Sequence, residues 1–532
     1  MTTALACVLL GVVLLAPSAL GGGAGLSASA AWLRVPADGL AAVALVLALP
    51  PRARRGGTIA VGTALGLLAI TKVLGLGFSA VLDRPFDLMS DWEFLGPGLE
   101  FLKRSMGNGG AIAVAIGAVA LTLGLAVLVA LAFIRVAPLV VRQRKAASWT
   151  VGGLAAVWLV CLLTGAQLVA GAPVATHDLY DRGKQVADGL IDRQRFGETL
   201  ATDVSREGPG PNGLNALRGK DVILAFVESY GKAALEDPEL SPHLRATLEQ
   251  GTQRLRELGF GARSGWLTSP TTGGGSWLAH STLQSGLWID DQQRYNQLIA
   301  SDRLTLSGAF HRAGWRTIGW MPGNNELWPE GQRFYGFDQL YASADVGYRG
   351  EKFAFDSIPD QFSLSALQRT ERSGSGRKPV MAMVPLLSSH APWDPVPKVV
   401  DWQAVGDGSI FDNGDAPSLS ADVLTRDRAR VRADYVKAID YTLESLVSYV
   451  ERYGGDDLVL VFLGDHQAGP IVTGFNWETG NRDVPITIVA RDPGVLNRVA
   501  GWAWDDGLMP GPGAPVWRMD DFRDMFLAAF AQ

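Results

Sequence analysis

The sequence has little charge and almost no cysteine. Charged residues make up 19% of its 532 residues, whereas about 25% is usual for a soluble domain. Its two cysteines, Cys7 and Cys161, both lie inside apolar stretches, which excludes the disulfide framework of a small secreted domain. The net charge of −6 argues against a nucleic-acid-binding protein, because such a protein needs a basic surface to neutralise phosphates.

What the sequence has in excess is apolar residues, and they gather toward the N-terminus. Residues 1–172 carry 12 Lys and Arg against 6 Asp and Glu, whereas the remaining 360 residues have a net charge of −12. The chain thus combines an apolar, basic part with an acidic, globular part. We expect a transmembrane domain at 1–172, an amphipathic juxtamembrane linker at 173–218 and a catalytic domain at 219–532.

Five apolar runs predict the membrane spans of the N-terminal part. They cover residues 3–20, 38–50, 58–81, 110–134 and 149–171. Because about 20 apolar residues cross a bilayer as a helix, we expect about five spans, of which the short second run is the weakest. The loops at 51–56 and 135–147 are rich in Arg and Lys, and such loops stay in the cytoplasm. The residues after 172 are therefore expected on the extracytoplasmic side.

Four short apolar runs in the C-terminal part have the length of buried strands. They are residues 221–227, 317–321, 380–387 and 458–463. A helical pattern lies at 428–453, with its apolar residues on one face and Gly454 after its end. Strands that alternate with helices indicate an α/β domain with a mostly parallel sheet.

Polar residues follow each of these four runs. They are Glu228 after the first, Asn324, Asn325 and Glu326 after the second, Ser388, Ser389 and His390 after the third, and Asp465 and His466 after the fourth. Ligands of open α/β sheets bind at the carboxyl ends of the strands, so we expect these side chains to meet in one crevice. Glu228, Asp465 and His466 offer two carboxylates and an imidazole, a set suited to a divalent Zn²⁺ or Mn²⁺ ion. The alternative interpretation of the Asp-His pair is a turn and helix cap.

A glycine-rich segment supplies three candidate hydroxyl nucleophiles. Thr271 and Thr272 precede three glycines, and Ser276 follows them. The leucines after Ser276 predict a helix that begins near it, and a helix N-terminus favours bound anions. We therefore favour Ser276 as the nucleophile, with Thr271 and Thr272 as its rivals. The alternative interpretation is that Ser276 only caps the helix.

These motifs together resemble a known family. VESYG, GGGSWLAHSTLQSGL, PGNNELW, SSHAPW and GDHQ, behind five apolar runs, are similar to the sulfatase-like branch of the alkaline phosphatase superfamily. Within it, the chain resembles the membrane enzymes lipoteichoic acid synthase and phosphoglycerol transferase. The resemblance implies one divalent metal, commonly Mn²⁺, with Zn²⁺ or Mg²⁺ as alternatives. Its ligands would be Glu228, Ser276, Asp465 and His466.

The resemblance also implies a reaction and a place in the cell. Ser276 would accept a phosphoglycerol or phosphoethanolamine group from a membrane phospholipid and pass it to a hydroxyl acceptor such as a glycan. His390 would act near the scissile phosphate, and Asn325, Trp328, His280 and Trp393 are expected to bind substrate. The enzyme would be a multi-pass protein of the bacterial cytoplasmic (inner) membrane, with its catalytic domain on the extracytoplasmic side.

Three other functions are compared with the predicted head-group transfer. Sulfate-ester cleavage is disfavoured, because Ser276-Trp-Leu-Ala-His280 lacks the Pro and Arg of the C/S-x-P-x-R motif that sulfatases need. A phosphodiesterase or phosphatase would use the same residues, with water as the acceptor. An inactive protein that binds a lipid or glycan during envelope assembly is the second alternative.

Overall fold

The computed structural model divides the chain into two compact units. It describes residues 2–15, 35–82, 86–164, 175–176, 178–201, 213–324, 328–412, 427–474 and 481–531. Unit 1 comprises residues 1–95 and 109–192, and unit 2 comprises residues 96–108 and 193–532.

Unit 1 consists of helices that coincide with the five predicted apolar runs. They are α1 (Thr3–Leu15), α2 (Ala37–Ala48), α3 (Pro51–Leu82), most of α4 (Leu95–Arg142) and α5 (Arg144–Thr164). Within the described residues, two stretches are long and apolar enough to cross a membrane, Pro51–Ser79 and Gly107–Arg142. The helices α1 and α2 have 13 and 12 residues, which at 1.5 Å per residue is shorter than a 30 Å hydrocarbon core. The count of five spans therefore stays a prediction.

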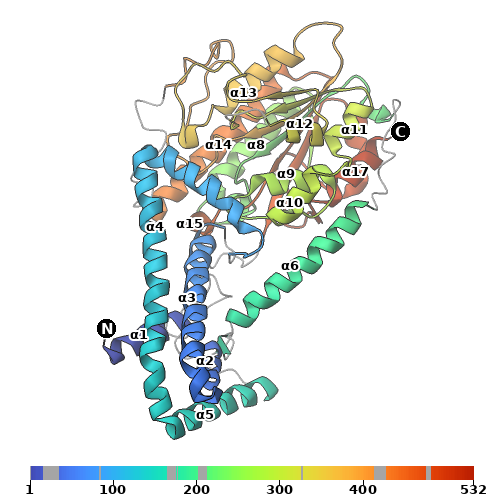
Figure 1. Ribbon diagram of the computed structural model, residues 1–532. Helices are drawn as coiled ribbons and strands as arrows, with labels where there is room; N and C mark the ends of the chain where they lie inside the picture. The colour runs from blue at the N-terminus through green and yellow to red at the C-terminus, as the bar shows by residue number, and fades with distance from the viewer. Residues whose placement is uncertain are drawn as a thin grey trace. The chain divides into compact units, whose positions relative to one another are not determined.

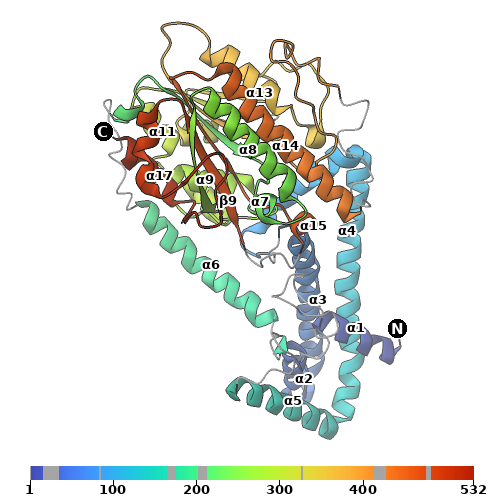
Figure 2. The same cartoon turned by 180° about the vertical axis from the view of Figure 1, so that it is seen from behind.

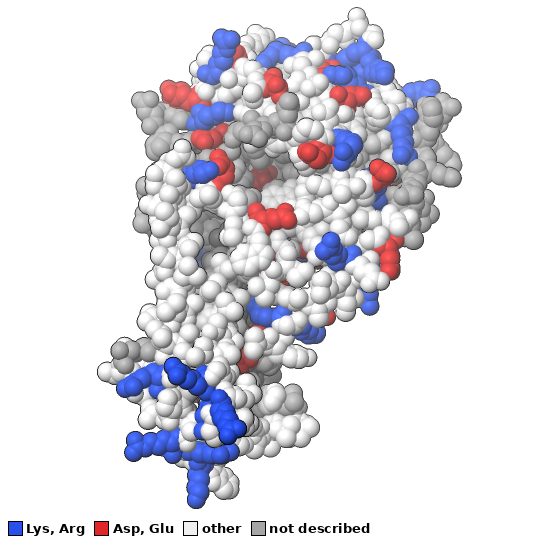
Figure 3. Space-filling model, in the orientation of Figure 1, with Lys and Arg blue, Asp and Glu red and all other residues white. Residues whose placement is uncertain are grey.

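The cations of unit 1 gather where α3 begins and α4 ends, as Figure 3 shows. Arg52, Arg54 and Arg55 belong to the first turns of α3. The last turn of α4 contains Arg142, and α5 opens with Arg144 and Lys145. Both basic segments thus lie at one end of unit 1, as the positive-inside pattern requires.

Most of the expected linker forms one helix, α6 (Asp178–Ala201). Its Leu179, Leu190 and Ile191 are exposed beside charged residues, so the helix is amphipathic. Its first residue, Asp178, pairs with the buried Lys72 of α3 at 2.9 Å. The sequence also predicts a Gly/Pro-rich joint from Gly208 to Gly213, which lies outside the described residues except for Gly213.

Unit 2 is built on a nine-stranded sheet. Its strands are β3 (Asp221–Val227), β4 (Gly261–Thr268), β5 (Arg316–Trp320), β6 (Gln339–Tyr341), β7 (Val380–Leu386), β8 (Leu458–Gly464), β9 (Asp483–Ala490), β10 (Asp505–Asp506) and β11 (Val516–Arg518). They lie in the order β10-β4-β9-β8-β3-β7-β5-β6, with β11 also beside β4. The five strands from β8 to β6 are parallel, whereas β9 runs antiparallel to both β8 and β4. The prediction of an α/β domain with a mostly parallel sheet is confirmed.

Helices cover both faces of this sheet (Figures 1 and 2). On one face α8 (Ser241–Glu257) packs along the long α14 (Arg428–Tyr453), beside α7 (Ala233–Glu236) and α13 (Asp360–Leu367). The other face carries α9 (Ser276–Ser285), α10 (Gln292–Ile299), α11 (Leu306–Arg312), α12 (Pro329–Tyr335) and α17 (Asp521–Phe530). Two short helices complete the unit, α15 (Pro470–Thr473) and α16 (Pro493–Arg498). Because both faces are covered, every residue of β3 and β8 is buried, which explains their uninterrupted apolar sequences.

Candidate active site

The register of three neighbouring strands sets the position of the site. Val227 at the end of β3 pairs with Leu386 of β7 on one side and with Gly464 of β8 on the other. The residues that follow, including Glu228 and Asp465, therefore emerge at one edge of the sheet. Gly464 is required there, since a Cβ on it would lie 1.8 Å from the carbonyl oxygen of Tyr230.

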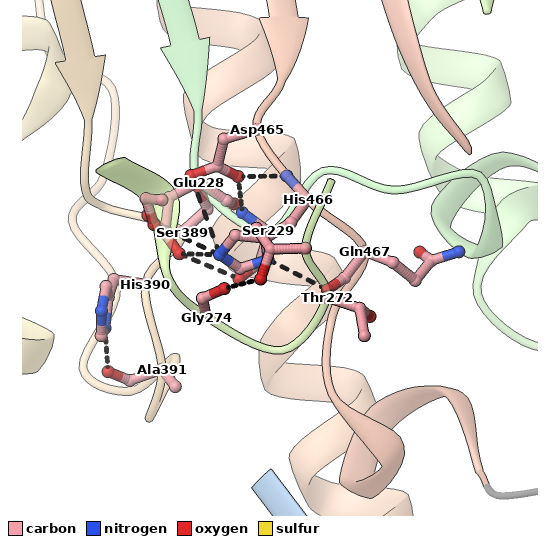
Figure 4. Close-up of polar contacts among 12 residues, drawn as sticks. Glu228, Ser229, Thr272, Gly274, Ser389, His390, Ala391, Asp465, His466 and Gln467 are labelled. Atoms are coloured by element: carbon pink, nitrogen blue, oxygen red, sulfur yellow. Dashed lines mark hydrogen bonds and ion pairs between the residues drawn. The ribbon is translucent and has the colours of Figure 1, made fainter. Parts of the chain in front are cut away.

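Three of the predicted metal ligands form a tight, buried cluster (Figure 4). One ligand atom from each of Glu228, Asp465 and His466 lies within 4.8 Å of the others. His466 Nε2 lies 3.1 Å from Glu228 Oε1 and 3.8 Å from Asp465 Oδ2. All three residues are buried, and buried charges of this kind need a partner or a metal.

The backbone after β3 holds Asp465 in a fixed orientation. Asp465 Oδ1 accepts hydrogen bonds from the backbone N–H groups of Ser229 (2.9 Å) and His466 (2.7 Å). Ser229 has φ +60°, a left-handed conformation that is uncommon for a residue other than glycine. The Tyr435 hydroxyl of α14 supports this turn by donating to the Ser229 carbonyl at 2.9 Å.

The other carboxylate oxygen of Asp465 marks where a cation fits. Oδ2 is buried and has no hydrogen-bond partner among the described residues. A buried oxygen that is left unpaired costs roughly 1–3 kcal/mol. It faces His466 at 3.8 Å, so a divalent ion that both residues ligate would remove this cost. The donor set of carboxylates, imidazole and hydroxyl suits Zn²⁺ or Mn²⁺.

The pKa values of the cluster reflect burial and mutual charge. Burial, and then the negative charge of Glu228, raise the pKa of Asp465 to about 8. Burial opposes the protonated form of His466, yet the two carboxylates raise the pKa of its imidazole to about 9. Burial likewise opposes ionisation of Glu228, but His466 outweighs it and holds the pKa of Glu228 well below its usual value. Near pH 7 and without a metal, Glu228 is therefore ionised, whereas Asp465 and His466 each hold a proton.

Ser276 adds a hydroxyl to this cluster. Gly275, with φ +78°, turns the chain into α9, and Ser276 is the first residue of that helix. Its Oγ donates a hydrogen bond to Glu228 Oε2 at 2.8 Å and lies 3.2 Å from His466 Nε2. No side-chain capping hydrogen bond is present at this helix start.

The two rival threonines direct their hydroxyls elsewhere. The Thr271 hydroxyl donates to the Gly274 carbonyl at 2.6 Å. The Thr272 hydroxyl donates to the Gln467 carbonyl at 3.4 Å, beside an isolated backbone bridge between the same two residues. Of the three candidates, Ser276 is therefore the one in contact with the cluster in the described structure.

A cavity of about 380 Å³ opens beside Ser276, and three of the remaining predicted residues line it, His280, Trp328 and His390. Its walls are largely aromatic, with Trp277, Tyr295, Trp328, Tyr335 and Phe355. The His390 ring stacks on Phe355 at 3.8 Å, and its Nδ1 lies 2.6 Å from the Ala391 carbonyl oxygen. Since a carbonyl can only accept, Nδ1 carries the hydrogen, and Nε2 is the nitrogen that can take up a proton.

The predicted substrate-binding residues have different surroundings. His280 and Trp328 line the cavity, as does Asn324. Asn325 lies outside the described residues. Trp393 is buried and donates from Nε1 to the Ser389 carbonyl at 2.8 Å, and it does not belong to the cavity lining.

Sequence reasoning missed the residues that position the His390 loop. Asp360 Oδ1 accepts from the backbone N–H groups of Leu387 (2.9 Å) and Ser388 (3.1 Å), and its Oδ2 accepts from the Thr442 hydroxyl (2.7 Å). Burial raises the pKa of Asp360 to about 6. Ser389 donates from Oγ to the Glu228 carbonyl at 2.7 Å, which connects this loop to the cluster of Glu228, Asp465 and His466. The Ser388-Ser389 pair was visible beside His390 in the sequence, whereas Asp360 belongs to no motif.

Comparison with known proteins places this region in a family. Residues 220–484 match the sulfatase family model, and no curated protein matches the sequence. Three of the solved structures similar to the chain are named here. The lipoteichoic acid synthase LtaP from Listeria monocytogenes has 14% identity and a TM-score of 0.35, and the match covers 58% of this chain and 71% of that one. The phosphoglycerol transferase GacH from Streptococcus pyogenes, in complex with sn-glycerol-1-phosphate, has 13% identity and a TM-score of 0.36, with 65% of this chain and 91% of that one covered. The C-terminal periplasmic domain of EptC from Escherichia coli has 14% identity and a TM-score of 0.37, with 62% of this chain and 84% of that one covered.

Proposed function

Residues 220–484 are a sulfatase-family domain of the alkaline phosphatase superfamily, and from this premise we propose that the chain is a phospho-head-group transferase. It takes a phosphoglycerol or phosphoethanolamine group from a membrane phospholipid and transfers it to a hydroxyl acceptor such as a glycan. The observation that carries the proposal is the contact of the Ser276 hydroxyl with both Glu228 and His466 at the N-terminus of α9.

Glu228, Ser276, Asp465 and His466 are the proposed metal ligands. Their fit is supported by the unpaired Asp465 Oδ2 and by the mixture of carboxylate, imidazole and hydroxyl donors. When bound, a divalent metal supplies positive charge that lowers the pKa of the Ser276 hydroxyl and polarises a phosphate oxygen. The resemblance favours Mn²⁺, and Zn²⁺ suits the same donors.

The proposed reaction has two displacements at phosphorus. In the first, Ser276 Oγ releases its proton to solvent water and forms a bond to phosphorus, while the bond from phosphorus to the diacylglycerol oxygen breaks. Protonated His390 then gives a proton to that leaving oxygen. In the second, the now neutral His390 Nε2 takes the proton of the acceptor hydroxyl, whose oxygen bonds to phosphorus as the Ser276–phosphorus bond breaks and Ser276 Oγ regains a proton from solvent water.

The geometry of α9 supports attack from this position. Ser276 is its first residue, and the unpaired N–H groups of a helix N-terminus favour an anionic phosphate. The adjoining cavity contains His390 and the aromatic side chains of Trp277 and Trp328, which provide apolar surface for the substrate. We propose that Trp328 contacts the substrate and that Asn325, which follows Asn324 in the chain, contributes to the same region.

The proposed location follows from the N-terminal part. The two candidate spans, Pro51–Ser79 and Gly107–Arg142, would anchor the enzyme in a bacterial cytoplasmic membrane. With the basic ends of α3 and α4 in the cytoplasm, we propose that residues 219–532 face the extracytoplasmic side.

An experiment with the full-length protein in lipid vesicles tests the proposal. Vesicles of phosphatidylglycerol and phosphatidylethanolamine are supplied with a divalent metal, and the intact mass of the protein is measured. A mass increase equal to phosphoglycerol or phosphoethanolamine, absent in Ser276→Ala, supports the covalent intermediate and identifies the group. No adduct and no lipid turnover would contradict it and favour the inactive assembly protein.

The acceptor is then distinguished in the same vesicles. Transfer of the head group to an added glycan supports the transferase. Release of the free head group at the same rate with and without glycan would instead identify a phosphodiesterase that uses water.

A further inference from the structure

A strained turn at residues 353–357 places an aromatic side chain in the cavity. Phe355 and Asp356, at the tip of the turn, have φ +59° and +52°, a left-handed conformation that is an outlier for a bulky residue. Phe353 and Ser357 close the turn as an isolated antiparallel bridge, in which the Phe353 N–H donates to the Ser357 carbonyl at 3.1 Å. Phe353 is buried, whereas Phe355 lines the cavity of the candidate active site. Strained backbone of this kind gathers at functional sites, which points to a function for Phe355.

The Phe355 ring lies flat against the imidazole of His390. The two ring centroids are 3.8 Å apart and the ring planes differ by 15°. At the edge of the imidazole, Nδ1 lies 2.6 Å from the Ala391 carbonyl oxygen. Because a carbonyl oxygen accepts hydrogen bonds over a broad range of directions, this contact alone leaves the imidazole free to tilt. The stacked Phe355 ring removes that freedom and fixes the plane of the imidazole.

The backbone connects the turn with the loop that carries His390. The Ala354 N–H donates to the Pro395 carbonyl at 3.3 Å. Trp393, between Pro395 and His390 in the chain, donates from its backbone N–H to the His390 carbonyl at 3.1 Å. Since Phe355 directly follows Ala354, these bonds hold the two stacked rings opposite one another, and the stack does not depend on side-chain packing alone.

We propose that Phe355 is a positioning residue that holds His390 for proton transfer. The inference rests on the proposed function, in which His390 gives a proton to the leaving oxygen and takes one from the acceptor hydroxyl. Proton transfer needs the two heavy atoms to lie about 2.6–3.2 Å apart, so an imidazole that tilts loses its partner. By fixing the plane of the ring, Phe355 keeps Nε2 where both oxygens can reach it in turn.

The test measures kcat and KM for head-group release by the full-length protein in vesicles of phosphatidylglycerol and phosphatidylethanolamine. Phe355→Leu keeps an apolar side chain but removes the flat face, whereas Phe355→Tyr keeps the face. We expect Phe355→Leu to lower kcat at least about tenfold, a part of the roughly 10²–10⁴-fold that general acid–base catalysis contributes. Its KM should change by less than about twofold, because an interaction made only in the transition state is lost. Phe355→Tyr should keep most of the wild-type kcat.

The matched control is Phe260→Leu, which also removes a buried aromatic ring. Phe260 directly precedes β4, whose first residue pairs with Ala490, and Ala490 pairs with Val459 near the start of β8. The candidate site follows the last residue of β8, so Phe260 lies at the opposite end of the strands. Phe260→Leu should therefore have the kcat of wild type.

A double variant separates positioning from direct contact with the substrate. If Phe355 acts through His390, Phe355→Leu should have no further effect on kcat in the His390→Ala background. An equal loss in both backgrounds, or a loss confined to KM, would overturn the inference and make Phe355 a substrate contact. Either result would leave the proposed function intact.

The stack itself can be measured in wild type without turnover. In NMR spectra of protein with labelled histidines, the ring hydrogens of His390 are identified by their absence in His390→Ala. They should lie upfield of those of His243, because a stacked aromatic ring shields hydrogens above its face, whereas the His243 side chain is 63% exposed and pairs with Asp440. No upfield shift would overturn the inference. The shift in a protein that neither forms the adduct nor turns over lipid would overturn the proposed function, and with it the role of Phe355.

Discussion

Metal binding at this site should release protons, and the number can be derived from the structure. The pKa of Asp465 is raised to about 8 and that of His466 to about 9. Both groups must lose their proton before they can act as ligands. Glu228 has a pKa well below its usual value, so it is already ionised and contributes none. Near pH 7 we therefore expect about two protons to leave for each divalent ion that binds.

The same pKa values give the size of the effect on affinity. At pH 7, removing the protons of Asp465 and His466 costs roughly 4 kcal/mol, which weakens metal binding about 1000-fold relative to the fully deprotonated site. With two protons released, affinity should rise by up to about 100-fold per pH unit between pH 6 and pH 7.5.

Calorimetric titration with Zn²⁺ at pH 7 measures this directly. Repeating the titration in two buffers with different ionisation enthalpies gives the number of protons released. Asp465→Asn keeps the shape of the side chain but removes one titrating group, so we expect it to release about one proton fewer and to bind more weakly. Wild type that releases less than half a proton, with an affinity independent of pH from 6 to 7.5, would refute the protonation of Asp465 and His466 argued above.

Three further predictions concern the nucleophile, the membrane topology and the His390 loop. Ser276→Ala should abolish turnover and the covalent adduct, measured by intact mass, whereas Thr272→Ala should keep at least partial activity; the reverse pattern would reassign the nucleophile. A phosphatase reporter fused after residue 218 should be active in the exported compartment and one fused near Arg54 inactive, and the opposite result would invert the topology. Because burial raises the pKa of Asp360 to about 6, its neutral form is favoured in the folded state. Wild type should thus lose roughly 2 kcal/mol of folding stability as pH rises from 4 to 7. In Asp360→Asn, the stability measured by thermal unfolding should not show this loss with rising pH. Identical pH profiles of stability for wild type and Asp360→Asn would contradict the prediction.

The central strands could be predicted because each is buried on both faces. The runs at 221–227, 380–387 and 458–463 correspond closely to β3, β7 and β8. By contrast, β4 contains Arg263, Ser264 and Gly265 at successive positions, and β9 contains Pro485, so neither has an uninterrupted apolar sequence. Both strands lie toward one side of the sheet, where the pairing is antiparallel, and β4 is in addition partly exposed.

The meeting of Glu228 with Asp465 and His466 was predictable for a topological reason. Adjacent parallel strands end at the same edge of a sheet, so residues that directly follow β3 and β8 must lie near one another. No equivalent rule specifies what supports them. Asp360 accepts a hydrogen bond from the His390 loop at Leu387, 27 residues away, and another from Thr442 of α14, 82 residues away. Its position therefore depends on how α13 packs against α14.

For His280 the sequence predicts the face of the helix but not what that face contacts. Its spacing of four residues from Ser276 places both side chains on one face of α9 once that helix is predicted to begin at Ser276. Spacing alone cannot tell whether that face turns toward the sheet edge or toward the substrate cavity. In the structure the His280 ring packs on Phe226, its Nε2 lies 3.9 Å from Asp465 Oδ2, and the residue also lines the cavity. A residue that the sequence suggests only as a substrate contact thus lies both in the cavity lining and beside Asp465.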